Sequence, residues 1–158
     1  MRSLLPALLL LVLLARAHAG DLAFARIGAE WHDAADFDRI SEYLGGGENT
    51  GGHTILRTHA EVRAGFYFLV HFERGVPTAG TKFELQVIRP DAPEAKTFSF
   101  SASPAAPNAR PVFELGLTGA DWPGGAKARP AAWRLALLDA DGRVLAEQKS
   151  FLWENPPK

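Results

Sequence analysis

The sequence holds one glycine-rich stretch of a kind that can bind phosphate groups, EYLGGGENTGGH at residues 42–53. A Walker loop requires Gly-x-x-x-x-Gly-Lys-Ser/Thr, but Gly46 and Gly51 are not followed here by lysine. A dinucleotide fingerprint requires glycines at its first, third and sixth positions, and the sixth position counted from Gly45 is Thr50. The spacing therefore excludes both nucleotide-binding motifs.

The same stretch displays the polar tripeptide Glu48-Asn49-Thr50 between two groups of glycines. Its carboxylate, amide and hydroxyl groups can bind a polar ligand, and binding residues often lie on loops. Tyr43, His53 and Arg57 are close in sequence and could complete such a site. The alternative is a solvent-facing loop with an Asx-type turn at Asn49, the commoner outcome for this composition. The candidate ligand-binding residues are therefore Tyr43, Glu48, Asn49, Thr50 and Arg57, with Trp122 as a separate candidate.

A second polar group, EWHDAADFD at residues 30–38, contains one histidine and four carboxylates. These are common metal ligands, but the spacing matches no zinc motif, and Asp33, Asp36 and Asp38 would not share one face of a helix. Helix capping and solvation account for these acids instead. The turn Asp139–Gly142 resembles the start of a calcium loop but lacks the later ligands, so a hairpin turn is expected. No metal site and no cofactor is predicted.

Catalytic motifs give little support to an enzyme. Glu42 and Glu48 are the nearest candidates for a pair of catalytic carboxylates, but nothing in the sequence fixes their separation. Ser41, His53 and Asp36 are the residue types of a serine triad, yet the chain has no Gly-x-Ser-x-Gly motif and no cysteine. No catalytic residue is predicted, and an enzyme is kept only as an alternative.

Trp122, in the turn sequence DWPGG, is the candidate for aromatic stacking. An exposed indole could stack on a sugar or on a partner protein. The alternative, which we favour, is that this ring folds over the open end of the domain and closes it as a plug.

The N-terminus has the three parts of a secretory signal peptide. They are a positive residue at Arg2, an apolar stretch over Leu4–Leu14, and the small-x-small cleavage site Ala17-His18-Ala19. A membrane anchor is the alternative, but a spanning helix needs about 20 apolar residues, and this run ends at Arg16. We therefore expect a mature chain that begins at Gly20, a periplasmic or extracellular location, and no stable membrane insertion after cleavage.

Charge and composition narrow the range of partners. The whole chain has 17 Lys and Arg against 18 Asp and Glu, and removal of Arg2 and Arg16 makes the remainder more acidic. Nucleic-acid-binding domains normally carry a basic surface, so nucleic acid and anionic membranes are not expected partners. Without cysteine the domain needs an ordinary hydrophobic core, and about 140 residues suffice for one. The composition is typical of a bacterial protein.

From residue 54 onward, apolar and polar residues alternate with the period of half-buried β-strands, and Gly/Pro clusters separate the strands. The predicted inward residues are Phe66, Phe68, Val70, Phe72, Phe83, Leu85, Val87, Phe98, Phe100, Phe113, Leu115, Leu117, Trp133, Leu135 and Leu137. We predict a mainly β protein with a single antiparallel β-sandwich. The divisions are a signal peptide at 1–19, an N-terminal segment at 20–53, the sandwich at 54–153 and a tail at 154–158.

Two parts of this pattern are less regular. Residues 33–44 have the signature of a short helix, and a strand over residues 40–44 is the open alternative. Residues 133–153 are expected to form a hairpin, with Leu145, Phe151 and Trp153 as inward residues of the returning strand.

The strand pattern over residues 54–153 resembles that of immunoglobulin-like and fibronectin-type-III-like sandwiches. Such folds host many unrelated functions, so the resemblance implies architecture and little else. The leading hypothesis is an exported, non-enzymatic module that binds a protein or an envelope component. One alternative is a carbohydrate-binding module that stacks Trp122 or Trp31 on polysaccharide. The other is a small metal-dependent or hydrolytic protein built around Glu30–Glu48.

Overall fold

The structure is a computed structural model, and it describes residues 22–38, 50–102 and 112–154. The predicted signal peptide and the candidate residues Tyr43, Glu48 and Asn49 lie outside the described residues, as does the possible strand at 40–44.

Within these ranges, eight strands form two four-stranded sheets, which confirms the predicted β-sandwich. The strands are β1 (Ala23–His32), β2 (Thr54–Arg57), β3 (Gly65–Arg74), β4 (Lys82–Ile88), β5 (Ala95–Ser101), β6 (Val112–Thr118), β7 (Ala132–Leu138) and β8 (Val144–Lys149). The short helical turns are η1 (Ala34–Phe37), η2 (Gly119–Asp121), η3 (Gly125–Lys127) and α2 (Phe151–Glu154).

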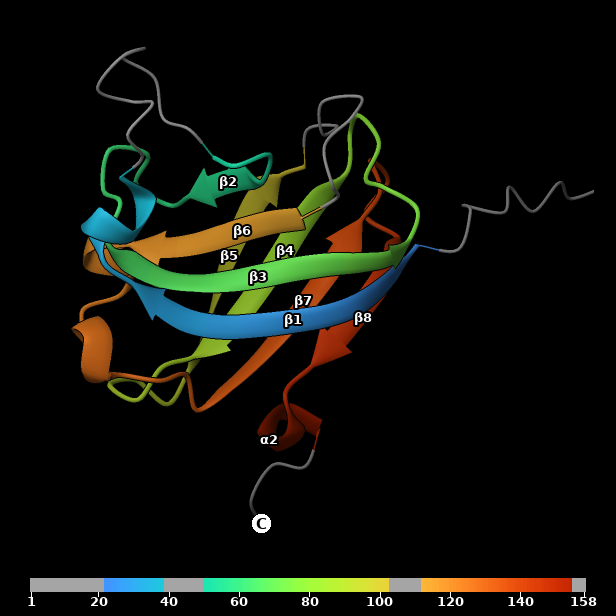
Figure 1. Cartoon of the computed structure of the whole chain (residues 1–158). Helices are drawn as coiled ribbons and strands as arrows, with labels where there is room; N and C mark the ends of the chain where they lie inside the picture. Colours follow the sequence, from blue (N-terminus) through green and yellow to red (C-terminus); the bar gives the residue numbers. More distant parts are fainter. Residues whose placement is uncertain (1–21, 39–49, 103–111, 155–158) are drawn as a thin grey trace, which may run out of the picture.

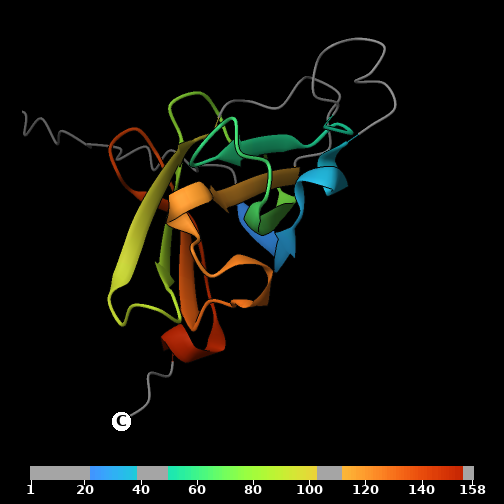
Figure 2. The same cartoon turned by 90° about the vertical axis from the view of Figure 1, so that its left-hand side faces the viewer.

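The first sheet has the strand order β1-β3-β6-β2 and the second sheet has the order β5-β4-β7-β8. Only β2 and β6 pair in parallel among the described strands; the other neighbours are antiparallel. Figure 1 shows the first sheet in front, with its strands crossing those of the second sheet, and Figure 2 shows the two layers from the side.

The core lies between the two sheets and is built from the residues that alternation had assigned to it. Phe66, Phe83 and Leu135 have no exposed surface, and the other predicted inward residues are buried or packed against the buried cluster. Several of these rings meet across the sandwich; Phe83 and Phe113, for example, have centroids 5.1 Å apart. Burial of these apolar side chains is the main stabilising term.

The sandwich begins earlier than predicted. Residues Ala23–His32, which we had assigned to a separate N-terminal segment, form β1 and pair with β3 along its length. The register shifts between Ala23 and Arg26 interrupt the strict alternation of this strand. Such an irregularity hides a strand from a period-two search, because it moves side chains to the opposite face.

The C-terminal hairpin is shorter than predicted, and the inward placement of Phe151 and Trp153 on its return strand was wrong. Strand β8 ends at Lys149, and α2 follows with Phe151 75% exposed. Ser150 accounts for this end, because its backbone N–H donates to the Trp133 carbonyl and its Oγ accepts from the Trp133 N–H. The chain then turns, and the Trp153 N–H donates back to the Ser150 carbonyl.

Of the two polar turns, the one at Asp139 folds as its residue types predict. Asp139 Oδ1 accepts the backbone N–H groups of Asp141 and Arg143, so the hairpin carboxylate holds its own turn. The helix predicted over residues 33–44 does not continue past its first turn: η1 ends at Phe37, because Asp38 is extended, and Asp36 Oδ2 accepts the Asp33 N–H at 2.8 Å within this turn. None of the described helices has the length and apolarity needed to cross a membrane.

Candidate functional site

A buried carboxylate lies at the centre of the outer face of the first sheet. Phe113 and Leu115 of β6 point into the core, so the intervening Glu114 points outward, between Leu69 of β3 and Ile55 of β2. Despite facing outward, the Glu114 side chain is only 10% exposed. A charged group this well covered costs free energy unless it has a partner, so its surroundings define the first candidate site.

The partner is a histidine from the end of the glycine-rich stretch. His53 Nδ1 lies 2.5 Å from Glu114 Oε1, and the imidazole is 37% exposed. With the carboxylate ionised and the imidazole neutral, Nδ1–H donates this hydrogen bond and Nε2 remains an acceptor. His53 is fixed in turn by its backbone N–H, which donates to the Thr50 carbonyl.

A cavity of about 90 Å³ lies beside this pair, enough space for several water molecules. It is lined by His32, Asp36, Phe37, Thr50, His53, Ile55 and Glu114. The end of β1 and η1 supply one wall, Thr50 and His53 a second, and β2 and β6 the floor. We call this the His53–Glu114 cavity.

His32 brings a second imidazole to the cavity. Its Nε2 lies 3.4 Å from Glu30 Oε1, and its Nδ1 lies 3.7 Å from Asp36 Oδ2. Nε2 is buried and has no hydrogen-bond partner among the described residues. A buried polar atom without a hydrogen-bond partner is uncommon. Because Nε2 is closed off, Nδ1, on the side of Asp36, is the His32 nitrogen nearer to the other lining residues.

Phe37 is anchored to the sheet by a cluster of rings. It lies 5.0 Å from the ring of Tyr67, and His32 packs edge-on against the same Tyr67. The Arg57 guanidinium lies 4.7 Å above the Phe37 ring, and Arg57 Nε donates to the Tyr67 hydroxyl at 2.7 Å. Tyr67 donates to the Arg63 carbonyl at 2.6 Å. These hydrogen bonds fix the position of the Tyr67 ring, against which Phe37 packs.

Of the residues predicted to bind a ligand, the structure brings one into the cavity. Thr50 lines it, whereas Arg57 lies behind Phe37 and is not part of the lining. His53, considered as a supplement to the site, is also present. His32 and Asp36 belong to the polar group at residues 30–38, whose acids were explained by helix capping. Asp36 both caps η1 and lines the cavity.

Glu114 was missed entirely. The available signal was a single charged residue inside the strand sequence VFELGLT, which alternation places on the outer face. An outward charge on a strand is usually solvated, and only the folding of Thr50 and His53 over β6 shows that this one is covered.

Trp122 occupies the position of a plug. Only 3% of it is exposed, its ring stacks on Phe66 with centroids 4.5 Å apart, and its Nε1–H donates to the Gly125 carbonyl. The segment η2–η3 that carries it closes one end of the sandwich (Figure 2). This indole therefore lacks the exposed face that stacking on a sugar requires.

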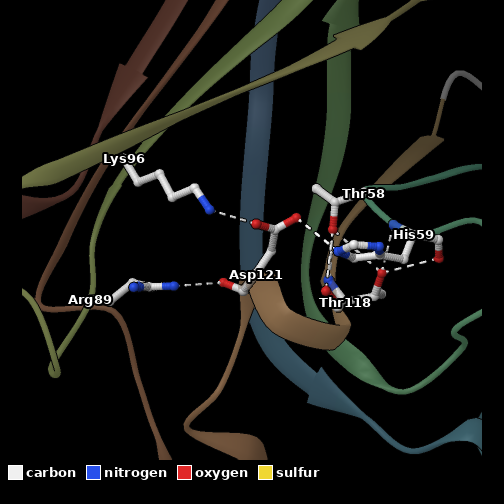
Figure 3. A network of polar contacts seen from close by, with 6 residues as sticks. All are labelled: Thr58, His59, Arg89, Lys96, Thr118 and Asp121. Atoms are coloured by element: carbon white, nitrogen blue, oxygen red, sulfur yellow. Dashed lines mark hydrogen bonds and ion pairs between the residues drawn. The ribbon is translucent and has the colours of Figure 1, made fainter.

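A second polar cluster has the residue types of a catalytic triad but is internally satisfied. Figure 3 shows this Asp121 cluster, which consists of Thr58, His59, Arg89, Lys96, Thr118 and Asp121. Thr118 Oγ1 exchanges hydrogen bonds with both backbone groups of His59, and Thr58 Oγ1 accepts the Thr118 N–H. The Thr118 hydroxyl is committed to the backbone, and the Thr58 hydroxyl accepts the Thr118 N–H and is hydrogen-bonded to Asp121, so neither is available as a nucleophile.

Asp121 joins the two sheets through this cluster. Its Oδ1 accepts from Lys96 of β5 at 2.6 Å, its carbonyl accepts from Arg89 after β4, and its Oδ2 lies 3.3 Å from His59 Nε2. Burial acts to raise the pKa of this carboxyl, but hydrogen bonds from Lys96 and Thr58 and the nearby charges of Lys96 and His59 outweigh it, so the pKa lies below 3.8. The cluster is a structural link between the sheets.

Asp121→Asn is expected to lower the free energy of unfolding at pH 7 by about 1–2 kcal/mol, because charge-assisted hydrogen bonds are lost. A carboxyl whose pKa is lower in the folded protein stabilises above its unfolded pKa, and this contribution is lost as pH falls through the folded pKa. The difference between wild type and variant should therefore shrink at acidic pH. Urea unfolding across pH measures this, with the exposed Asp141→Asn as control. A constant difference at every pH would contradict the assignment.

His71, on the outer face of β3, is kept neutral near the cavity. Burial lowers its pKa, and the charges of Arg26 and His53 lower it further. Its Nε2 is buried without a hydrogen-bond partner among the described residues. His71 therefore adds no positive charge beside the His53–Glu114 cavity at neutral pH.

The comparisons with known proteins found no relative that indicates a function for this site. No protein-family model, no curated protein and no solved structure matches the chain significantly. Within the described residues, no three His, Asp or Glu side chains come together as ligands of one metal ion.

Proposed function

We propose that the protein is an exported, non-enzymatic binding module that holds part of a protein or envelope component in the His53–Glu114 cavity. The observation that carries this proposal is Glu114, a carboxylate buried on the outer face of a sheet beside open space. Burial of a charge opposes folding, so such a group at a cavity favours a binding role over a structural one.

The strand order supports the resemblance to immunoglobulin-like domains as part of this proposal. With β2 set aside, β1-β3-β6 and β5-β4-β7-β8 correspond to the orders A-B-E and C′-C-F-G. Strand β2 takes the place of strand D beside E, but it runs parallel to its neighbour. Export is supported by the signal-peptide pattern at residues 1–19.

A capture experiment with the tagged full-length chain, recovered from the exported fraction, tests the function. We expect an N-terminus at Gly20 and a saturable partner. Thr50→Phe should abolish capture, because a phenyl ring at the lining position fills the cavity whatever the charge of the ligand. Thr97→Phe, on the exposed face of β5, is the matched control and should bind as wild type does. Absence of a saturable partner, or full capture by Thr50→Phe, would overturn the proposal.

A hydrolase is the second candidate, because a carboxylate-oriented histidine is the base of many hydrolytic sites. The pair of His53 and Glu114 has the required contact. Ester or amide hydrolysis that is lost in His53→Ala, without any captured partner, would favour this alternative. The carbohydrate alternative now depends on Trp31, which is only partly exposed and donates its Nε1–H to Asp33. Polysaccharide as the captured component would favour it.

A further inference from the structure

We propose that the His53–Glu114 cavity binds a cationic nitrogen group, an ammonium or guanidinium, and this rests on the proposed function. Of the seven described residues that line it, Asp36 and Glu114 are carboxylates and none is lysine or arginine. An anionic ligand would lie beside two carboxylates with no lysine or arginine among the described lining residues, which opposes its binding.

The hydrogen-bonding groups that remain are mostly acceptors. Glu114 uses Oε1 for His53, and no described residue bonds to its second oxygen. Asp36 uses Oδ2 for the Asp33 N–H, and its other oxygen likewise has no bonded partner among the described residues. When its ring is neutral, His53 presents Nε2 as an acceptor while Nδ1–H is donated to Glu114. A ligand that supplies several N–H donors matches this set.

Among the described residues, the basic side chain of Arg57 contacts the lining through the Phe37 ring. The Arg57 guanidinium lies over the Phe37 ring, and its Nε donates to the Tyr67 hydroxyl. Arg57 itself is not one of the lining residues. His71 remains neutral, because burial and the charges of Arg26 and His53 lower its pKa. The volume of about 90 Å³ accommodates the end of an alkylammonium or alkylguanidinium chain but not a large ligand.

Titration of the full-length protein with n-butylammonium, n-butylguanidinium, 1-butanol and butyrate, followed by NMR at the His32 and His53 rings, tests the proposal. 1-Butanol has the shape of butylammonium without its charge, and butyrate reverses the charge. We expect both cations to bind and neither control to do so.

Peptides with lysine or acetyl-lysine then distinguish a partner's side chain from a free amine, since only a side-chain site prefers the lysine peptide over butylammonium.

Two variants remove one negative charge each. Asp36→Asn keeps an oxygen acceptor for the η1 cap, and Glu114→Gln keeps the shape of the floor. Glu114→Gln should weaken cation binding by about tenfold or more, because a buried charge partner is lost, and Asp36→Asn, at a half-exposed carboxylate, should weaken it by about threefold or more. Glu147→Gln, on the outer face of the second sheet, should not. Equal binding of 1-butanol, or unchanged cation binding by Asp36→Asn, would overturn the proposal.

The two proposals fail in different ways. If Thr50→Phe abolishes partner capture but no cation binds, the binding function stands and the ligand class is wrong. If cations bind and no partner is ever captured, the ligand class stands and the proposed function is wrong.

Discussion

Trp122→Ala is expected to lower the free energy of unfolding by about 3–5 kcal/mol, the largest effect of any single change that we predict. Trp122 is only 3% exposed, because it closes the end of the sandwich over Phe66. It stacks on Phe66 at 4.5 Å, so its loss leaves a cavity against a ring that itself has no exposed surface. The hydrogen bond from Nε1–H to the Gly125 carbonyl is lost as well. Urea or thermal unfolding followed by far-UV circular dichroism measures the change.

Trp122→Phe is the matched variant for this prediction. It keeps an aromatic ring against Phe66 and removes the indole N–H, so we expect a clearly smaller loss of stability than for alanine. A loss of less than about 1 kcal/mol for Trp122→Ala would show that the plug does not support the sandwich. Because the alanine variant perturbs the core, loss of sugar binding in that variant would not identify Trp122 as a sugar contact.

Gly116→Ala is expected to cost about 1–3 kcal/mol, the typical penalty for overpacking. A Cβ atom at this position would lie 2.5 Å from Tyr67 Cε1 and 2.8 Å from Cζ. The ring cannot move aside easily, because its hydroxyl is bonded to Arg57 and to the Arg63 carbonyl and its faces contact other rings. Chemical denaturation measures the cost, and NMR of the His53 ring should show that the cavity wall has moved.

Gly28→Ala provides the control on the same sheet. A Cβ atom there would lie 3.8 Å from Leu69 Cβ, an ordinary contact. Alanine in a strand interior is more favourable than glycine by roughly 0.5–1 kcal/mol, so this variant should be neutral or slightly more stable. If both variants were equally destabilised, the close approach of Tyr67 to β6 would not be the cause.

The alternation of apolar and polar residues predicted the core, because burial of one apolar face contributes most to the stability of these strands. Phe66, Leu85 and Leu117 could be assigned inward from sequence alone, since a shift by one residue would expose them. Strand β1 escaped the same search because its register shifts near Phe24 and its regular part contains the small residues Gly28 and Ala29. The end of β8 escaped because Ser150, a single polar residue, terminates pairing before an apolar run.

The candidate site was much harder to predict, because its residues belong together only through tertiary structure. The glycine-rich stretch drew attention to Thr50 and His53, and both line the cavity. Nothing in the sequence indicated that His53 would meet Glu114, which is 61 residues away. This contact depends on the parallel pairing of β2 with β6. The alternation of residues within a strand does not specify which strand it pairs with.

That long separation has a consequence for the newly made protein. His53 precedes β3, and Glu114 lies in β6, so the cavity exists only after most of the chain has been synthesised and the first sheet has closed. Contacts between residues so far apart form late, because the loop between them must first be ordered. An incomplete or unfolded chain therefore has no cavity to offer, and the protein acquires its capacity to bind only at the end of folding.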